Sequence, residues 1–283
     1  MSTPNGILLY TPEDAKRNRW FIEQLCTYAE SENLSLRLCL TDSPETHKLV
    51  MQDADFIVNR SRSYIHSSVA QNVRHIPCFN SAEVTGITNS KYLTYCVLHG
   101  EHGIPMAKTW QFSRSNPQPE LPFPLVAKPA DGHGGEGVAW IADRAALEQY
   151  AAAFDAAHPE PTYPFLLQEP VVTGWDVRIY MLGGEIYAAV LRTSDSDFRS
   201  NFSLGGHAEV IAPNAEMRTF AARVQQVMPL DFAGVDLLRH PDGGYVLGEI
   251  EDAVGCRMLY QLTELDPAKD YMHLIAERLK AQG

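Results

Sequence analysis

Ala233-Gly-Val-Asp-Leu-Leu-Arg-His240, Pro241-Asp-Gly-Gly244 and Tyr245-Val-Leu-Gly-Glu-Ile-Glu251 follow one another in the most informative part of the sequence. The first and third segments are rich in apolar residues with single polar residues between them, and the second consists of turn-forming residues. This pattern predicts an antiparallel hairpin in which a four-residue loop pairs His240 with Tyr245.

Three carboxylates meet in this hairpin. Counting back from the loop, Asp236 lies opposite Glu249, and Glu249 and Glu251 share one face with Cα atoms about 7 Å apart, because side chains alternate along a strand. Isolated charges beside apolar sequence are costly, and hard divalent cations such as Mg²⁺ relieve that cost through oxygen ligands. The arrangement favours a metal site over its alternative, a solvated acidic face on which like charges repel one another mildly.

The composition limits the classes of partner. The chain has 283 residues, and 23 basic against 35 acidic residues give a net charge of −12. Nucleic acids and anionic membranes both require a positive surface, so neither is an expected partner. The first residues lack the features of a signal peptide, no apolar stretch reaches about 18 residues, and the five cysteines show no C-x-x-C spacing. We therefore expect a cytoplasmic protein of about two domains, at about 150 residues per domain.

The remaining patterns predict an α/β protein. Apolar runs at Gly6–Tyr10, Leu34–Leu40 and Asp55–Asn59, with a helix starting after the N-cap at Thr11, predict a small βαβ-type unit. Further helices are expected at Asn89–His102, from Asp143, around Met217–Met228 and from Asp266. Further strands are expected at Pro124–Lys128, Gly137–Ala142, Asp176–Leu182 and Glu185–Arg192.

The segment Gly132-His-Gly-Gly-Glu-Gly137 satisfies the pattern G-x-G-x-x-G. It leads into a strand and not into a helix, which excludes a Rossmann dinucleotide site. Lys128 precedes the loop, and no H-R-D or D-F-G segment follows, which excludes a protein kinase. Two interpretations remain, a surface turn or a hairpin loop whose backbone N–H groups, at Gly134 and Gly135, close over phosphate oxygens.

Cationic and polar side chains accompany the acids. Alternation along one strand points Asp176 and Arg178 the same way, Arg192 ends the next strand, and Arg199 and Asn201 follow in a polar segment. A single arginine is more often a surface ion-pair partner, but guanidinium groups gathered around the acidic hairpin favour a phosphate site.

Arg60 and Arg62 follow the third N-terminal strand, each beside a serine. Substrates often bind beyond the C-terminal ends of strands in α/β sheets. A grip on a substrate carboxylate is therefore one interpretation of these two arginines, and an ordinary loop is the other.

The order of these segments resembles the ATP-grasp superfamily, most closely its RimK-like branch of ribosomal-protein glutamate-ligase-like enzymes. The resemblance runs from about Asn89 to Leu259, and the matching segments stand in the family's order. They are Asn89-Ser-Lys91 with Thr94, Gly103-Ile-Pro105 with Thr109, Leu125-Val-Ala-Lys128, the glycine loop, Leu167-Gln-Glu169-Pro-Val171, Asp176-Val-Arg178, Asp197-Phe-Arg199-Ser-Asn201, Gly234-Val-Asp236 and Glu249-Ile-Glu251.

The resemblance implies an α+β ATP-grasp fold in three parts. These are an N-terminal α/β pre-ATP-grasp domain (residues 1–88), a small central lobe with the glycine-rich loop (89–165), and a C-terminal antiparallel-sheet lobe with the metal site (166–283). ATP is implied to lie between the last two parts.

The resemblance also implies roles for single residues. Lys91 and Lys128 would contact the phosphates of ATP, Gln168, Glu169 and Val171 would hold the adenine, and Asp176 would hold the ribose. Arg199 and Asn201 would serve the phosphate end, and Arg178 and Arg192 would lie near the γ-phosphate or the acyl-phosphate. Asp236, Glu249 and Glu251 would bind one or two Mg²⁺ ions, with Mn²⁺ as an alternative.

The implied chemistry is phosphorylation of a carboxylate by ATP, followed by attack of an amine on the acyl-phosphate. Such a reaction depends on positioning and charge neutralisation more than on a protein nucleophile. We expect an amino acid to be joined to a small molecule or peptide, in a protein compatible with a homo-oligomer. The alternatives are a glutamate ligase acting on a protein C-terminus, a non-catalytic ATP-binding regulatory subunit and, less favoured, a phosphotransferase.

Two departures from the family pattern concern the metal and the acceptor. Glu251, followed by Asp252, replaces the usual Asn of E-x-N, which changes the charge at the metal site. Ala253–Met258 replaces the usual Ser-Pro-Gly-type loop. Because that loop lies near the acceptor in the family, the resemblance does not extend to the identity of the substrates.

Overall fold

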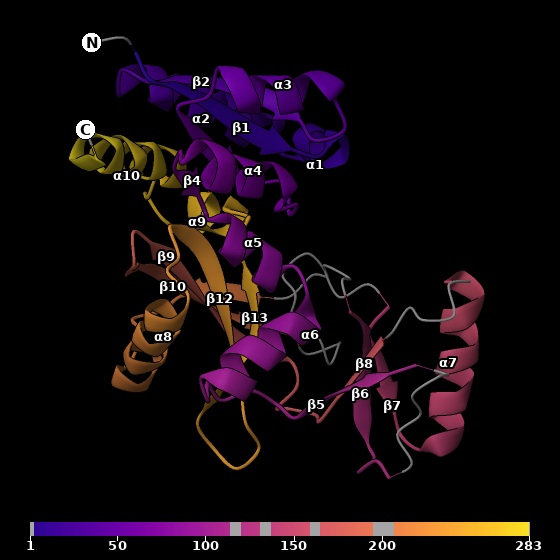
Figure 1. The fold of residues 1–283 in the computed structure, drawn as a ribbon. Helices are drawn as coiled ribbons and strands as arrows, with labels where there is room; N and C mark the ends of the chain where they lie inside the picture. The colour runs from indigo at the N-terminus through magenta and orange to yellow at the C-terminus, as the bar shows by residue number, and fades with distance from the viewer. Residues whose placement is uncertain (1–2, 114–119, 131–136, 159–164, 195–206, 283) are drawn as a thin grey trace.

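The computed structural model describes residues 3–113, 120–130, 137–158, 165–194 and 207–282. Three sheets organise these residues (Figure 1). The first is parallel and carries the N-terminal strands, whereas the other two are antiparallel. The mixed α/β class predicted from the sequence is confirmed.

The N-terminal sheet has the strand order β2-β1-β3-β4. Its strands are β1 (Asn5–Tyr10), β2 (Ser35–Leu40), β3 (Phe56–Asn59) and β4 (Cys78–Phe79), with helices α1 (Pro12–Arg17), α2 (Arg19–Ser31), α3 (Pro44–Gln52) and α4 (Ile65–Arg74). The side chain of Thr11 accepts a hydrogen bond from the Asp14 N–H, and Pro12 opens α1, as expected of an N-cap. The predicted βαβ unit is confirmed.

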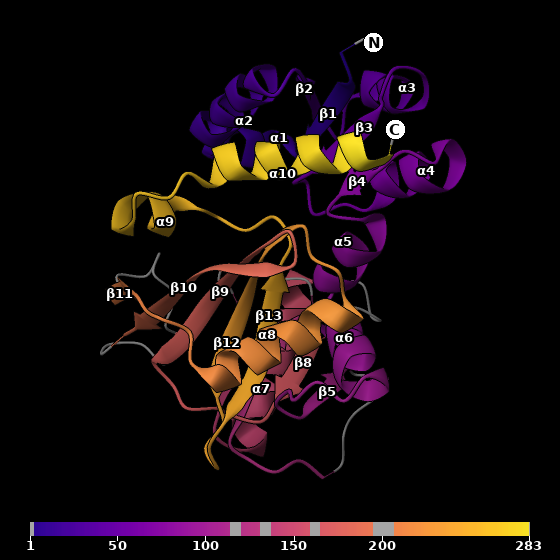
Figure 2. The same ribbon diagram turned by 90° about the vertical axis from the view of Figure 1, so that its left-hand side faces the viewer.

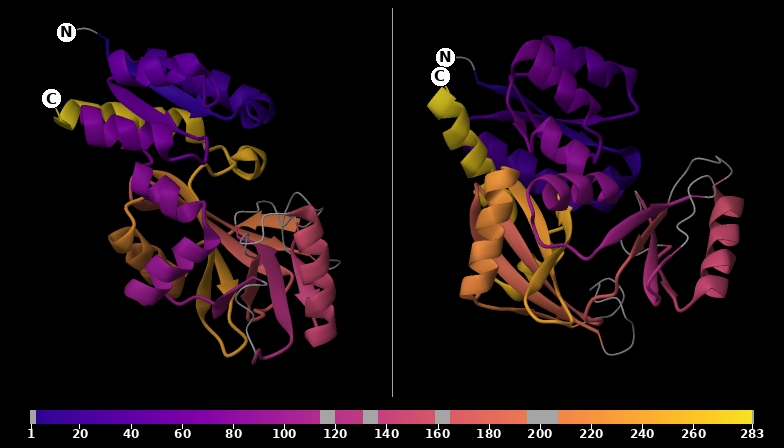
Figure 3. Two further views of the ribbon diagram at one scale, coloured as in Figure 1. Left: turned by 45° about the vertical axis from the view of Figure 1, so that its right-hand side comes forward. Right: turned by 60° about the horizontal axis from the view of Figure 1, so that its bottom comes forward.

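The central sheet has the order β5-β8-β6-β7 and carries one helix on a face. Its elements are β5 (Thr109–Phe112), β6 (Leu125–Pro129), β7 (Ala139–Ile141), β8 (Phe165–Gln168) and α7 (Arg144–Ala157). Asp143 caps α7 through the Ala146 N–H, and Leu147 and Phe154 pack on the sheet. Figure 3 shows this sheet and α7 as a separate block beside the C-terminal sheet. The glycine loop precedes β7, so its predicted exit into a strand is confirmed.

The C-terminal sheet has the order β11-β10-β9-β12-β13. Its elements are β9 (Trp175–Leu182), β10 (Glu185–Thr193), β11 (His207–Val210), α8 (Ala215–Val227), β12 (Phe232–Arg239) and β13 (Tyr245–Glu251). Val177, Ile179 and Met181 of β9 enter the core that contains α8, and Tyr180 enters the core on the opposite face. Alternation therefore places Asp176 and Arg178 on the face away from α8, which confirms that the two side chains point the same way.

The acidic hairpin was predicted correctly at its acids and wrongly at its loop. Asp236 pairs with Glu249 as expected, but Arg239, and not His240, pairs with Tyr245. A β-bulge between the pairs Asp236–Glu249 and Leu237–Leu247 takes up the difference at Gly248. A five-residue connection and one bulged residue thus restore the register that a four-residue loop alone would give.

One predicted helix is divided in the structure. The stretch expected as a single helix over Asn89–His102 consists of α6 (Lys91–Thr94) and a π-helical segment (Tyr95–Glu101), preceded by α5 (Ala82–Thr88). The π-helical segment ends before Gly103, whose φ is +64°. The predicted end of the helical stretch is confirmed to within one residue, whereas the single continuous helix is wrong.

The C-terminal helices bind the first and last sheets together. Helices α9 (Arg257–Leu262) and α10 (Pro267–Gln282) end the chain, and α10 lies between the N-terminal layer and the C-terminal sheet (Figure 2). One core contains Leu8 from β1, Phe232 from β12 and Tyr271 from α10. This shared core fixes the C-terminal ends of β1 and β3 over the charged face of the C-terminal sheet. The domain boundaries after residues 88 and 165 stay predictions.

The bulge generates a stability prediction. A Cβ at position 248 would lie 3.0 Å from the Leu238 side chain and 3.3 Å from the Asp236 carbonyl oxygen. We expect Gly248→Ala to lower the free energy of unfolding by about 1 kcal/mol because the neighbours must move. Urea unfolding measures the change, and Gly100→Ala is the control, since a Cβ there meets no atom within 4 Å. Equal stability of the two variants would contradict this account of the bulge.

Candidate active site

A buried network of arginines and aspartates lies on the charged face of the C-terminal sheet. Arg178 Nε and Nη2 donate to Asp236 Oδ1 and Oδ2, both at 2.8 Å. Arg192 Nη2 also donates to Asp236 Oδ2 at 2.8 Å, and Arg192 Nε donates to Asp176. Each of the four residues is at most 9% exposed. Two-pronged bonds of this kind fix the guanidinium planes.

The strand order and register of the C-terminal sheet explain the geometry of this network. Asp236 on β12 stands directly across from Arg178 on β9, and Asp176 on β9 stands across from Arg192 on β10. Gly234 leaves space for Val254 and for the arginine, since a Cβ there would lie 2.8 Å from Val254 Cγ2 and 3.4 Å from Arg178 Cδ. The motif Gly234-Val-Asp236 therefore serves the arginine on the neighbouring strand as well as the hairpin.

Asp236 stays charged inside this network. Burial by itself would raise the pKa of Asp236, but the charges and hydrogen bonds of Arg178 and Arg192 outweigh it and hold that pKa well below its usual range. Both carboxylate oxygens accept from guanidinium groups. In the described chain Asp236 thus orients two arginines, which the prediction of three convergent metal ligands did not foresee.

Glu249 and Glu251 lie beside this network on β13. Glu251 Oε2 forms an ion pair with Arg178 Nη1 at 2.5 Å, yet this buried oxygen accepts no hydrogen bond of good geometry. Burial raises the pKa of Glu251, and the neighbouring carboxylates of Asp236 and Glu249 add to that rise. A carboxylate oxygen that has an ion pair but no well-aligned hydrogen bond keeps lone pairs that a metal cation can take up.

A divalent cation fits the two glutamates better than it fits all three acids. Among the described residues, no group of three or more His, Cys, Asp or Glu side chains has the geometry of a metal site. Glu249 and Glu251 nevertheless line two cavities in common, while Asp236 is occupied by arginines. Mg²⁺ commonly takes one or two carboxylates and completes its shell with water and phosphate oxygens, so two glutamates suffice.

Two lysines and Glu249 line a further cavity between the central and C-terminal sheets. Lys128 Nζ donates to Gln168 Oε1 at 2.8 Å, and Gln168 Nε2 donates to Thr109 Oγ1 at 2.8 Å. Burial, together with the charge of Lys91, lowers the pKa of Lys128 to about 8. The structure therefore brings Lys91, Lys128, Gln168 and Glu249 together, four residues that the sequence assigned to ATP or metal.

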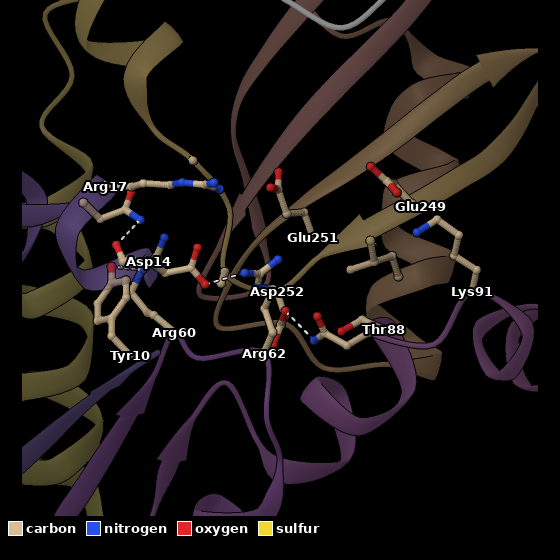
Figure 4. A pocket seen from close by; sticks show the side chains of 15 residues that line it. Tyr10, Asp14, Arg17, Arg60, Arg62, Thr88, Lys91, Glu249, Glu251 and Asp252 are labelled. Carbon is tan, nitrogen blue, oxygen red and sulfur yellow. Dashed lines mark hydrogen bonds and ion pairs between the residues drawn. The ribbon is translucent and has the colours of Figure 1, made fainter. Parts of the chain in front are cut away.

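A cavity of about 250 Å³ connects these groups to the N-terminal sheet (Figure 4). Arg60 and Arg62, which follow β3, line it together with Lys91, Glu249 and Glu251. Both arginines proposed to grip a substrate thus share one cavity with the residues proposed for phosphate and metal.

Other lining residues of this cavity were not singled out from the sequence. Asp14 forms an ion pair with Arg62, and Asn89 Nδ2 donates to Asp252 Oδ1 at 2.9 Å. Asp14 lies in the helix predicted to start after Thr11 but was assigned no role, and Asp252 was noted only as the neighbour of Glu251. Asp14 follows β1 and Asp252 follows β13, and both strands end at this cavity. That position after a strand was the feature of the sequence that could have identified them.

Glu169, Val171 and Asp176 do not line these cavities. Glu169 and Val171 follow β8 in the connection to β9, where the Glu169 N–H donates to the Lys108 carbonyl. Asp176, assigned to the ribose, is buried against Arg192. Four predicted residues lie outside the described part of the chain, namely Gly134, Gly135, Arg199 and Asn201.

Comparison with known proteins agrees with this arrangement. A model of the RimK-like ATP-grasp domain matches residues 107–275. The chain belongs to the RimK-like ATP-grasp family. This confirms the resemblance inferred from the order of the sequence segments, and it supports ATP-dependent carboxylate–amine ligation.

Named relatives of this RimK-like chain include an alpha-aminoadipate–LysW ligase, LysX, of Sulfurisphaera tokodaii, which is 25% identical over 84% of this chain and 85% of the relative. Human N-acetylaspartylglutamate synthase A is 32% identical over 62% of this chain and 46% of its own length. The chain thus spans about half of that longer relative.

Solved structures show the ATP-grasp fold. The D-alanine–D-alanine ligase of Bacillus anthracis, complexed with ATP, superposes with a TM-score of 0.71 at 15% identity, covering 99% of this chain and 100% of that chain. A RimK domain protein of Sphaerobacter thermophilus gives a TM-score of 0.68 at 18% identity, over 96% and 98% of the two chains. Within the described residues, no helix has both the length and the apolar character needed to cross a membrane.

Lys128 generates a prediction on pH. Its pKa is about 8 in the folded protein against an ordinary value of 10.5 for lysine, so between these values the unfolded chain keeps a proton that the folded protein loses. This group therefore makes the free energy of unfolding rise with pH across that window. We expect a rise of about 1–2 kcal/mol, less than the full shift implies, because the side chain is partly exposed.

Urea unfolding of the wild type and of Lys128→Met at about pH 7 and about pH 10 measures this rise. The stability of Lys128→Met relative to wild type is expected to be greater at the lower pH. Lys269→Met, at an exposed lysine, is the control. An equal difference between wild type and Lys128→Met at both pH values would contradict the lowered pKa.

Proposed function

We propose that this protein is an ADP-forming ligase that activates a carboxylate as an acyl-phosphate and joins it to an amine, linking an amino acid to a small molecule or peptide. The observation that supports it most is the continuity of the site. Glu249 lines the cavity that holds Lys91 and Lys128, and it also lines the cavity that holds Arg60 and Arg62. Phosphate-binding and substrate-binding groups thus border one another.

ATP is proposed to bind with its phosphates toward Lys91 and Lys128, which supply compact positive charge. Mg²⁺ at Glu249 and Glu251, when bound, would neutralise charge on the phosphates. The adenine is assigned to the Gln168–Val171 segment and the ribose to Asp176. Gly134, Gly135, Arg199 and Asn201 are assigned to the phosphate end by family resemblance.

Arg178 and Arg192 are proposed to stabilise the transferring phosphoryl group or the acyl-phosphate. Asp236 holds both guanidinium groups in fixed orientations, which lowers the reorganisation required when negative charge develops beside them. Arg178 and Arg192 line the same cavity as Glu249 and Glu251, so they lie next to the proposed metal ligands.

The one cysteine that lines this cavity does not suit covalent catalysis. Burial raises the pKa of Cys256 to about 12, so the side chain stays a thiol near neutral pH and is a poor nucleophile. The amine substrate is therefore proposed to attack the acyl-phosphate directly. All five cysteines are free, which fits the proposed location in the reducing cytoplasm.

Two substitutions test the proposal. We expect Lys128→Ala and Glu249→Ala each to abolish ADP release, because the first removes a phosphate cation and the second a metal ligand. The reaction is found by incubating ATP with paired carboxylates and amines and detecting a condensation product by mass spectrometry. Lys269→Ala and Glu264→Ala, at exposed positions, are matched controls that keep wild-type turnover.

Two results would contradict the proposal. Undiminished turnover in Lys128→Ala or Glu249→Ala would remove the assignment of the site. A phosphorylated acceptor without any condensation product would replace the ligase with a phosphotransferase.

A further inference from the structure

A second cavity, of about 510 Å³, adjoins the first one. The two cavities share Arg60, Glu249 and Glu251 as lining residues, so they meet where the N-terminal sheet faces β13. The second cavity continues from this junction toward α2 and α9, with Trp20 and Tyr260 in its wall. Its volume lies in the range of sites that bury a small molecule.

Arg60 at this junction is a buried cation without a carboxylate partner. It is 4% exposed, and its Nε donates to Tyr10 Oη at 2.8 Å while its Nη2 donates to the Val254 carbonyl at 2.7 Å. The Phe21 ring faces the guanidinium at 4.9 Å. Among the described residues, no acid forms an ion pair with Arg60. Burial raises the pKa of Asp252 and the charge of Arg60 opposes that rise, but Asp252 accepts a hydrogen bond from Asn89 and none from Arg60.

A buried guanidinium group in this setting favours an anionic ligand. The Tyr10 hydroxyl and the Val254 carbonyl accept from only two of the five N–H donors of Arg60. Because both acceptors are neutral, they offset only part of the free-energy cost of burying the charge. A carboxylate matches the planar fork of the guanidinium with two parallel bonds. Both cavities border Arg60, so a ligand in either one reaches it.

A ligand carboxylate bound at Arg60 would not be the one that reacts. In Figure 4, Arg60 lies beside Tyr10 at one end of the first cavity, and Lys91 lies beside Glu249 at the other end. The carboxylate that receives the phosphoryl group must lie at the lysine end, because the phosphates are assigned there. A carboxylate at Arg60 therefore belongs to the other substrate, the amine.

Two aromatic rings in contact form part of the wall of the second cavity. Trp20 is 53% exposed, and its ring meets Tyr260 edge to face with centroids 4.8 Å apart. Tyr260 is held in turn, since its hydroxyl donates to Asp266 Oδ1 at 2.9 Å and accepts from the Ala268 N–H at 3.1 Å. The exposed Trp20 ring, positioned by Tyr260, can pack against an apolar group of a ligand.

Arg17 and Arg257 also line this cavity and argue for an acidic group in place of an apolar one. Both side chains are exposed, so solvent and salt screen their charges. Apart from Arg60, the other two arginines of the lining, Arg178 and Arg192, are already paired with acids. Trp20, Tyr260 and the buried Met258 instead offer apolar surface that an apolar side chain would remove from water. The apolar contribution outweighs the screened charge.

We infer that the amine substrate is a free amino acid with an aromatic or large apolar side chain, an inference that rests on the proposed ligase function. Its carboxylate binds Arg60 at the junction of the cavities, its amine faces Glu249 and Glu251, and its side chain enters the cavity walled by Trp20 and Tyr260. The product then carries a free carboxylate next to the new amide bond.

Binding of four probes tests the inference without turnover. Calorimetry in the presence of ATP analogue and Mg²⁺ compares phenylalanine, phenylalaninamide, alanine and glutamate, each in both enantiomers. We expect phenylalanine of one hand to bind at least about tenfold more tightly than its amide, which lacks the carboxylate. We also expect it to bind more tightly than alanine and glutamate of the same hand.

Variants assign the effects to residues. Arg60→Lys, which keeps the charge but loses the fork, is expected to weaken phenylalanine binding about tenfold and to leave the amide unchanged. Trp20→Ala is expected to reduce the preference for phenylalanine over alanine about fivefold or more. Arg19→Ala, an exposed neighbour on α2, is the control. Binding of the ATP analogue shows whether each variant is folded. If Arg60→Lys no longer binds the analogue, the comparison of phenylalanine with phenylalaninamide in the wild type tests the carboxylate site.

Equal binding of acid and amide by the wild type, or binding of neither, would overturn the carboxylate site at Arg60. Tighter binding of glutamate than of phenylalanine would overturn the apolar side-chain cavity. These results are distinct from failure of the ligase proposal, which would show as absence of a condensation product with every substrate pair.

Discussion

The paired hydrogen bonds between Arg178 and Asp236 are the interaction on which the C-terminal sheet and the candidate active site both depend. Burying the two charges is costly, and the cost is offset only because both carboxylate oxygens and two guanidinium groups satisfy one another. Asp236 on β12 and Arg178 on β9 lie on neighbouring strands, and Arg192 adds the next strand, β10. The same bonds therefore fix both the register of the C-terminal sheet and the orientation of the proposed phosphate-binding arginines. Removing Asp236 would leave the buried guanidinium groups of Arg178 and Arg192 with Glu251 and Asp176, respectively, as their acidic partners.

A second constraint places the N-terminal sheet over this network. Asn80, 1% exposed, donates from Nδ2 to the carbonyls of Phe232 and Asp252, both at 2.9 Å, and its Oδ1 accepts from the Asp231 N–H. Arg60 reaches the Val254 carbonyl from the same side. The ends of β12 and β13 are thus tied to the N-terminal sheet, and this junction encloses the two cavities in which catalysis and substrate selection are proposed to meet.

Local pattern predicted the strands, the capped helices and the pairing of Asp236 with Glu249, because these depend on residues close in sequence. It missed the bulge at Gly248. The predicted loop was one residue too short, and the bulged residue compensates for this error, so Asp236 still pairs with Glu249. It could not reveal that Asp236 binds Arg178 and Arg192, because that contact depends on the order of strands in the sheet. The wall formed by Trp20 and Tyr260 was likewise hidden, since helices from opposite ends of the chain build it.

The account requires that ATP phosphorylate a carboxylate before the amine attacks, and oxygen labelling tests this most directly. With an active substrate pair and an ¹⁸O-labelled carboxylate, attack of the amine on the acyl-phosphate expels inorganic phosphate that keeps one carboxylate oxygen. We predict one ¹⁸O atom in the phosphate for each amide bond formed, with ADP as the other product. Amide formation with unlabelled phosphate, or with AMP as the product, would contradict the account.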